Sequence, residues 1–419
     1  MTALLKRPTI QAAIIQSALL LIFLYTPISQ FRHAIYTPAD YLQSFHLTYV
    51  AVQPDEPVKN PILSDVTQDV NSWLLFDRDT LRTGQIPLWN PYNGNGVPQL
   101  ANYQSGIFSV YTLPFYVLPF KWALLLTAYL RLFVSGFFTF IFFKLLGLKQ
   151  LPALFGSLAF MFCGYSIVWL SYPQSGTLTF LPLSLCCLEW AFQRYERRSP
   201  GSLNRALRWP LIGLTAALTI GLLGGHPETL YFCGLLVAAY TVFRLLTVWN
   251  ADHFRRAALR SLSGLILSIG LAGLLALAIS AVQILPFAEY LKNSFTVATY
   301  GSQRSQLHES ARLWPLSIYP DLFGNPADPQ SIGFFTLSNQ IFDKGIFKSS
   351  FLNDIGNFST DSNQFNVNAF INYNENIGAY PGAITLCLAI FGIVCAVRSP
   401  KRKTILFFGG VVLLSVIFA

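Results

Sequence analysis

Long apolar stretches set the pattern of hydrophobic and polar positions along this chain. Each runs for about 18–25 residues, the length that a helix needs to cross roughly 30 Å of hydrocarbon. Because lipid offers backbone groups no hydrogen-bond partner, we expect every such stretch to be helical. The pattern predicts nine membrane spans, at about residues 11–28, 121–146, 152–172, 175–193, 209–225, 228–247, 261–286, 379–397 and 404–419.

The two ends of the chain need separate interpretations. The first span also has the form of a signal peptide, with Lys6 and Arg7 ahead of an apolar run. No small-residue cleavage site follows at Tyr25–Gln30, which favours an uncleaved span. The last span ends at Ala419 without a polar flank, so we expect the chain to be a fragment of a longer protein.

The composition of the 419 residues narrows the class of protein. Hydrophobic residues make up 53% of the chain and charged residues only 11%, whereas ordinary globular chains carry roughly a quarter charged residues. So little polar surface cannot cover a folded core in water. Soluble enzymes, disordered chains and disulfide scaffolds are therefore excluded, and an all-α polytopic membrane protein remains.

The basic residues indicate which loops face the cytoplasm. They outnumber acidic residues in the linkers Arg194–Arg208, Arg244–Arg260 and Arg398–Lys403. With nine spans, these linkers fall on the same side as the N-terminus, and the positive-inside rule makes that side cytoplasmic. Two long loops, at about 29–120 and 287–378, then lie outside. The formal charge of +9 therefore reports topology and anionic lipid headgroups rather than nucleic acid.

Cysteine and phosphate-binding patterns restrict where chemistry can occur. All six cysteines fall inside predicted spans: Cys163, Cys186, Cys187, Cys233, Cys387 and Cys395. No external disulfide or zinc-type spacing is predicted, and no Gly-x-x-x-x-Gly-Lys loop occurs. The cytoplasmic linkers are too short for a nucleotide-sugar domain. We therefore expect any chemistry in the membrane or on its outer face.

A short amphipathic helix is predicted in the first outer loop. Ser64 is placed to cap a helix starting at Asp65, and apolar residues follow at near-helical spacing. Such a helix would lie in the interface, with its apolar side among the headgroups. Asp65 and Asp69 would share one face and repel each other unless solvent, a cation or a substrate holds them. An ordinary acidic helix N-terminus, which complements the helix dipole, explains the same spacing.

A Gly- and Pro-rich segment, Thr83–Pro98, follows this helix. At that density Gly and Pro stop helix and strand alike, so we expect a rigid loop built of turns. Aromatic and amide side chains in and just after the segment suit a sugar ring; these are Trp89, Tyr92, Asn102 and Gln104. The same composition fits a loop docked on the span ends, with the aromatic residues as interface anchors.

Several of these motifs resemble the bacterial YfhO family of membrane proteins. The matching motifs are Leu63–Asp65, Gly84–Pro91, Ala101–Ser105, Gly225–Glu228, Gln283–Pro286 with Glu289, Asn374–Glu375 and Tyr380–Gly382. The resemblance covers essentially the whole chain, and the Pro-Leu-Trp-Asn-Pro run is its most specific part. It implies a GT-C-type glycosyltransferase of the bacterial cytoplasmic membrane, a helical bundle with two long outer loops. Such an enzyme takes sugar from a polyprenyl-phosphate carrier and decorates envelope polymers such as teichoic acids.

The resemblance also implies roles for particular residues. An acid in the loop after the first span is expected as general base, and Asp65 is the matching position, with Asp69 as second carboxylate or contact to a divalent cation. The two acids are not adjacent, so the choice of base between them stays open. The predicted substrate contacts are Trp89, Asn90, Tyr92, Asn102, Gln104, His226, Glu228, Lys292 and Arg304.

The connection between the fifth and sixth spans is a candidate phosphate site. Gly224 and Gly225 end the fifth span, and Pro227 suits the first position of the sixth. His226 would then lie at the outer N-terminus of a membrane helix, where free N–H groups and the dipole attract an anion. It could bind a lipid phosphate, shuttle a proton, or act as a cap exposed to water.

Other ionisable residues are weaker candidates. Lys292, Arg304, His308 and Arg312 begin the second outer loop as phosphate cations or solvated charges. Arg131 lies mid-span, where an arginine normally faces a partner or a polar cavity. Glu189 is nearer the inner end of its span, where it could simply reach the interface. Neither belongs to the predicted catalytic set.

A transporter or flippase of lipid-linked sugars is the alternative function. Transporters tend to show internal repeats and interrupted helices with polar residues at the midplane. The sequence shows no convincing repeat, and its polar residues concentrate in the outer loops. The pattern therefore favours the transferase.

Overall fold

The structure is a computed structural model that describes residues 7–29, 35–40, 42, 63–199, 202–251, 256–294, 318–320, 378–399 and 401–418. The described residues are mainly helical, with one two-stranded sheet. The chain divides into two compact units. Unit 1 comprises residues 1–32, 74–162 and 172–299, and unit 2 comprises residues 33–73, 163–171 and 300–419.

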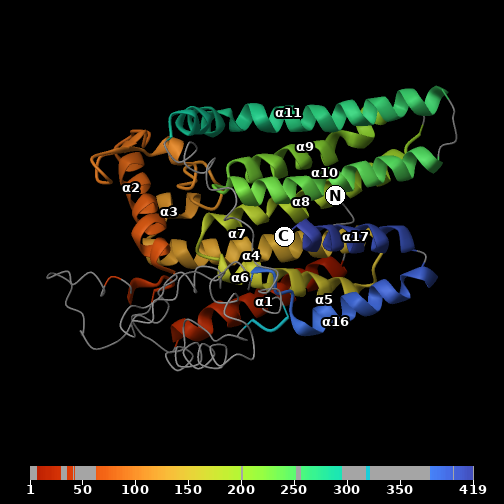
Figure 1. The fold of residues 1–419 in the computed structure, drawn as a ribbon, viewed down its shortest axis with the longest axis horizontal. Coiled ribbons are helices and arrows are strands. Elements are labelled where there is room, and N and C mark those ends of the chain that lie inside the picture. Colours follow the sequence, from red (N-terminus) through yellow and green to blue (C-terminus); the bar gives the residue numbers. More distant parts are fainter. Residues whose placement is uncertain are drawn as a thin grey trace, which may run out of the picture. The chain divides into compact units, whose positions relative to one another are not determined.

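Among the described residues, five helical segments are long and apolar enough to cross a membrane. They lie in α1 (Arg7–Ser29), α4 (Phe120–Leu145), the pair α7 (Pro173–Leu178) and α8 (Phe180–Glu196), α10 (Pro227–Ala251) and α11 (Arg256–Asn293). The expected all-α architecture with several membrane-length helices is confirmed. The long helices of unit 1 run alongside one another in Figure 1.

The other predicted spans are helical but do not meet that measure. They contain α5 (Gln150–Met161), α9 (Leu203–Leu222), α16 (Ala383–Val394) with the 3₁₀ turn η8 (Cys395–Arg398), and α17 (Arg402–Phe418). α5 and α16 are apolar but short. α9 carries arginines in its first two turns, which lowers its hydropathy.

The predicted third span, 152–172, is wrong as a single helix. α5 ends at Met161, Cys163 is extended, and a separate short helix, α6 (Gly164–Val168), follows. In unit 2 the backbone N–H of Gly164 donates to the carbonyl oxygen of Tyr380 at 2.9 Å, so it is not available to continue a helix. The boundary between the two units falls at this break.

The second outer loop begins later than predicted. α11 continues to Asn293 rather than ending at 286, because Pro286 is accommodated inside it and helix-forming residues such as Glu289 follow. Of the predicted loop 287–378, only 287–294, 318–320 and 378 lie among the described residues.

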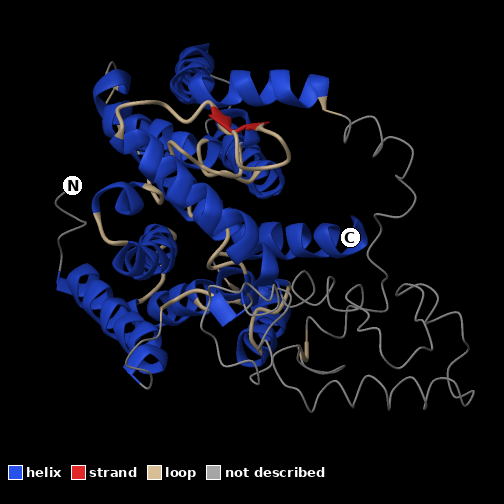
Figure 2. Cartoon of the chain, turned by 90° about the vertical axis from the view of Figure 1, so that its left-hand side faces the viewer, coloured by secondary structure: helices blue, strands red, loops and turns tan. Residues whose placement is uncertain are grey.

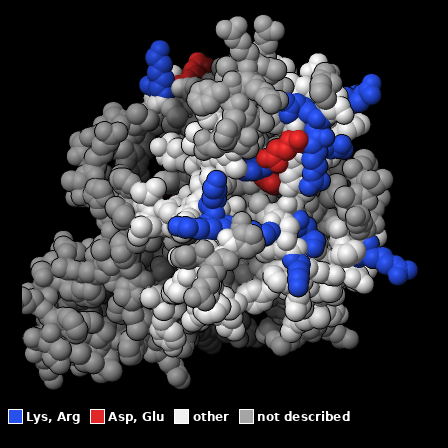
Figure 3. All heavy atoms as spheres, turned by 90° about the vertical axis from the view of Figure 1, so that its right-hand side faces the viewer, with Lys and Arg blue, Asp and Glu red and all other residues white. Residues whose placement is uncertain are grey.

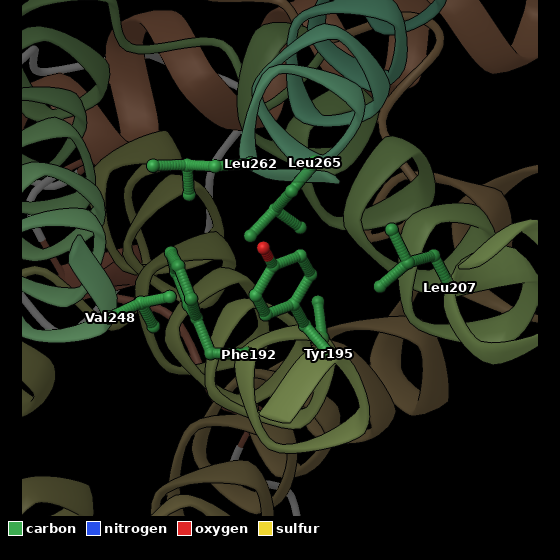
Figure 4. Packing of buried hydrophobic residues seen from close by; sticks show 7 residues of the cluster. Phe192, Tyr195, Leu207, Val248, Leu262 and Leu265 are labelled. Carbon is green, nitrogen blue, oxygen red and sulfur yellow. The ribbon is translucent and has the colours of Figure 1, made fainter. Parts of the chain in front are cut away.

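The cytoplasmic ends expected for α8 to α11 meet in an apolar cluster of unit 1. It consists of Ala191, Phe192, Tyr195, Leu207, Val248, Leu262 and Leu265, contributed by all four helices. Figure 4 shows the ring of Tyr195 surrounded by these aliphatic side chains. On the face where α10 ends and α11 begins, Lys and Arg outnumber Asp and Glu (Figure 3).

Arg131 and Glu189, both inside predicted spans, are buried and partnered. Nη1 of Arg131 donates to the carbonyl oxygen of Tyr172 at 2.8 Å. Glu189 does not reach the interface, which corrects that expectation, because its side chain is only 6% exposed and pairs with Nε of Arg244 at 2.9 Å. Tyr240 also donates its hydroxyl to Glu189, at 2.7 Å.

Candidate functional site

The predicted acids lie at the start of a helix in unit 2. The helix opens with a π-helical turn, η3 (Val66–Val70), and continues as α2 (Asn71–Arg82), whose residues from Leu74 on belong to unit 1. Ser64 does not cap it, since its hydroxyl donates to the Asp65 carboxylate at 3.3 Å. Burial and the nearby Asp65 carboxylate raise the pKa of Asp69. The two carboxylates therefore interact as their spacing predicts, while their catalytic role stays a prediction.

The Gly- and Pro-rich segment forms a small hairpin in unit 1. Strand β1 (Trp89–Asn90) pairs antiparallel with β2 (Val97–Pro98), so the expectation of no strand is wrong (Figure 2). The ladder is possible because the turn residues, not the strand residues, take the unusual backbone angles. Gly94, Asn95 and Gly96 all have positive φ.

A buried hydrogen-bond chain holds the hairpin on α2. Oδ1 of Asp77 accepts from Nε2 of Gln99 at 2.8 Å, and Oε1 of Gln99 accepts from Nδ2 of Asn90 at 3.3 Å. Asp77 is fully buried, and its second oxygen, Oδ2, has no partner among the described residues. Burial raises the pKa of Asp77 to about 7. A substantial fraction of this carboxyl is therefore protonated at neutral pH.

Sequence reasoning missed Asp77, although a signal was present. Trp73, Leu74 and Leu81 follow the apolar stripe of the helix, and position 77 falls between them on that stripe. A carboxyl at a stripe position is expected to be buried and to need a partner. Its partner, Gln99, lies in a different element, so spacing alone could not identify it.

The segment after the hairpin packs on the C-terminal half of α11, the end predicted to face outward. It forms a 3₁₀ turn, η4 (Leu100–Asn102), whose Leu100 carbonyl accepts from Nε2 of Gln283 at 2.6 Å. The ring of Tyr103 lies 4.6 Å from that of Phe287, and its hydroxyl donates to the Leu222 carbonyl at 2.5 Å. These contacts connect the first outer loop to both α11 and the end of α9.

Two glycines allow close packing around the connection between α9 and α10: Gly224 against α7, and Gly225 against this segment. A Cβ on Gly224 would lie 2.4 Å from the hydroxyl of Thr177. Gly225 has φ +91°, and a Cβ there would lie 3.4 Å from the carbonyl oxygens of Tyr103 and Gln104. The backbone of Gln104 therefore lies close to Gly225, the residue before His226. Gln104 and His226 are both predicted substrate contacts, and they are far apart in sequence.

His226 caps α10 in a defined tautomer. Its Nδ1 accepts from the backbone N–H of Thr229 at 3.1 Å and lies 2.8 Å from the Thr229 hydroxyl. An amide N–H can only donate, so in the neutral ring the proton is on Nε2. Burial lowers the pKa of His226 to about 4, so the ring is uncharged at neutral pH. Of the predicted roles, capping is therefore confirmed, although by a largely buried ring rather than one exposed to water; phosphate binding and proton transfer stay predictions.

The cap predicts a specific pattern of substitutions at this position. His226→Ala should lower the stability of the full chain by about 1 kcal/mol, because the Thr229 N–H loses its acceptor. His226→Asn should restore most of that loss, since asparagine is a good N-cap residue. Thermal unfolding of the purified protein in detergent measures both. Equal destabilisation by the two variants would contradict a capping role.

The remaining predicted site residues have diverse positions. Trp89 is 54% and Tyr92 86% exposed. Glu228 is exposed in the first turn of α10, and Lys292 is exposed in the last turn of α11. Arg304, His308 and Arg312 lie outside the described residues, as do Asn374 and Glu375.

No metal centre is apparent in the part of the chain that the structure describes, where no three His, Cys, Asp or Glu side chains come together. Comparisons with models of known protein families, with curated proteins and with solved structures found no match.

Proposed function

We propose that this chain is a membrane glycosyltransferase of GT-C-like architecture in the bacterial cytoplasmic membrane, with its N-terminus in the cytoplasm. It moves a sugar from a polyprenyl-phosphate donor to a cell-envelope acceptor at the outer face. The observation that carries the proposal is the packing of the amide- and aromatic-rich first outer loop. Its Tyr103–Gln104 segment lies against both the α9–α10 connection and α11. The resemblance of these same segments to the YfhO family supports the assignment.

The proposed reaction is an inverting transfer. The acceptor hydroxyl oxygen attacks the anomeric carbon of the donor, the bond from that carbon to the phosphate oxygen breaks, and polyprenyl phosphate leaves. Asp65 takes the proton of the acceptor hydroxyl. The position of Asp69 supports this role, because it supplies a second carboxylate close to Asp65, and burial and the charge of Asp65 raise the pKa of Asp69.

The leaving phosphate needs hydrogen-bond donors or cations. His226 serves in this proposal as a neutral donor through Nε2–H, since its Nδ1 is committed to the cap. Lys292, exposed in the last turn of α11, supplies positive charge. In this proposal the positive charge at the phosphate comes from residues such as Lys292, whereas the histidine contributes a neutral hydrogen bond.

Release of carrier phosphate tests the proposal. The purified full chain, mixed with a polyprenyl-phosphate hexose and envelope polymer, should release polyprenyl phosphate and label the polymer. Asp65→Asn should reduce both by at least about a thousandfold, the scale of losing a general base. Asp79→Asn is the matched control, because Asp79 is an exposed acid paired with Arg78 on α2. Full activity of Asp65→Asn would reject Asp65 as the base.

The alternative is a flippase of lipid-linked sugars that performs no chemistry. It predicts no release of polyprenyl phosphate by the purified chain. In cells lacking the protein, lipid-linked sugar would accumulate on the inner leaflet only. A transferase predicts accumulation on the outer leaflet as well.

A further inference from the structure

The indole of Trp89 lies against a glycine near the start of the opposite strand. A Cβ built on Gly96 would lie 2.5 Å from Nε1, 2.6 Å from Cζ2 and 2.7 Å from Cε2 of Trp89. These three consecutive atoms form one edge of the indole, so the Gly96 backbone supports that edge, and a side chain at position 96 would displace it. More than half of the Trp89 residue, 54%, is still exposed. The ring is therefore held along one edge by the backbone, and much of its surface is open to solvent.

The turn beneath this ring is rigid. The backbone N–H of Tyr92 donates to Oδ1 of Asn90 at 3.0 Å, and the N–H of Gly96 donates to the Asn93 carbonyl at 2.8 Å. Asn90 is itself held by Gln99. A ring fixed in this way loses little conformational freedom when a ligand binds.

The segment of sequence that carries the ring is uncharged. Between Arg82 and Lys121 the sequence has no Asp, Glu, Lys, Arg or His. Exposed side-chain amides border the hairpin, among them Gln85, Asn93 and Asn95. A flat aromatic face attracts the weakly positive C–H groups of a pyranose ring, and amides bond its hydroxyls. Anionic headgroups or charged peptides would find no complementary charge on this segment.

We propose that Trp89, supported by Gly96, is a stacking platform for a neutral hexose ring of a surface glycan. The proposal that the hexose binds depends only on the structure of the hairpin. The proposal that the bound glycan is the acceptor of the transfer depends in addition on the proposed function. The indole stacks on the hexose, and the neighbouring amides fix the orientation of its hydroxyls.

Binding of a neutral oligosaccharide tests the platform directly. The full chain in nanodiscs is titrated with a β-linked glucose hexamer and a β-linked galactose hexamer, followed by saturation-transfer NMR. The wild type should bind at least one of them, and Trp89→Ala should weaken that binding by about tenfold or more. Trp89→Phe should retain part of it. Trp122→Ala is the control, since Trp122 is similarly exposed, at 59%, but lies outside the hairpin.

Gly96→Ala provides a second variant in which the indole itself is unchanged. Because the added methyl would occupy the place of the ring, the indole must move, and binding should fall about as much as in Trp89→Ala. An unchanged thermal unfolding temperature of Trp89→Phe shows that the hairpin is intact. Binding by Trp89→Ala equal to wild type, or no binding by wild type, overturns the proposal.

Lipid insertion of the hairpin is the competing outcome, since Ile86 and Leu88 are also exposed. Brominated lipids should quench the fluorescence of Trp122 but not that of Trp89. The contribution of each tryptophan is the difference in fluorescence between the wild type and the variant Trp122→Phe or Trp89→Phe. Quenching of Trp89 as strong as that of Trp122 rejects the platform. Glycan binding without release of carrier phosphate leaves the platform standing and rejects only the transferase.

Discussion

Replacing Glu189 by alanine should destabilise the chain by about 3 kcal/mol or more, because it removes one partner of a buried ion pair. The carboxylate accepts hydrogen bonds from Tyr240 and Gln193 and pairs with Arg244, so three side chains from α8 and α10 lose their shared partner. Thermal unfolding of the purified chain in detergent, and its abundance in membranes, measure the effect.

Glu196→Ala is the matched control for this prediction. Glu196 pairs with the same arginine at the same distance, 2.9 Å, but its side chain is 42% exposed. Its loss should cost at most about 1 kcal/mol, since water replaces an exposed partner. The double variant Glu189→Ala with Arg244→Met should be more stable than Glu189→Ala alone, because no buried charge is left unpaired. Equal costs for the two glutamates would show that burial does not strengthen the pair.

Replacing Asp77 by asparagine should stabilise the chain above pH 7 and leave it nearly unchanged near pH 4. The pKa of Asp77 is raised from 3.8 to about 7 by burial, so the folded state binds a proton that the unfolded state releases. Stability from this group is complete below pH 4 and is lost as pH rises to 7. At about 1.4 kcal/mol per pKa unit, the shift corresponds to a difference of up to about 4 kcal/mol.

The measurement is the difference in unfolding temperature between variant and wild type from pH 4 to 8. A difference is needed because His226 acts in the opposite direction. Its pKa is lowered to about 4, so its contribution is present above pH 6.5 and is lost as pH falls. Asp79→Asn, on the same helix but exposed, should not reproduce the Asp77→Asn profile. A flat difference across this range would contradict a buried, protonated Asp77.

The helices could be predicted from the sequence because their signals are local. The apolar stretches correctly predicted the positions of α4 and α10, and Pro227 correctly predicted the first residue of α10. The break after Met161 could not be predicted, since the apolar residues continue through it and the competing partner, Tyr380, is more than two hundred residues away.

The sequence suggested residues for a candidate site, whose role stays a prediction, but it did not indicate how they are arranged. The residue types of Trp89, Gln104 and His226 indicated sugar and phosphate chemistry from sequence alone. The contacts that organise them join distant segments, such as Tyr103 with Leu222 and Leu100 with Gln283. No periodicity encodes such pairs. The neutral state of His226 also required its burial and its bond to Thr229, which only coordinates provide.

The length of α11 indicates the depth at which the predicted first outer loop would lie in a bilayer. Its 38 residues span about 57 Å at 1.5 Å per residue, whereas the hydrocarbon core of a bilayer is about 30 Å thick. With Leu262, where the apolar window begins, at the inner boundary, hydrocarbon ends about twenty residues later, next to Gln283. Gln283 holds the carbonyl of Leu100, so in a bilayer the first outer loop would be anchored at the level of the headgroup phosphates. A lipid-borne phosphate could then meet this loop without its hydrocarbon tail leaving the membrane, while the last turns of α11 rise into water.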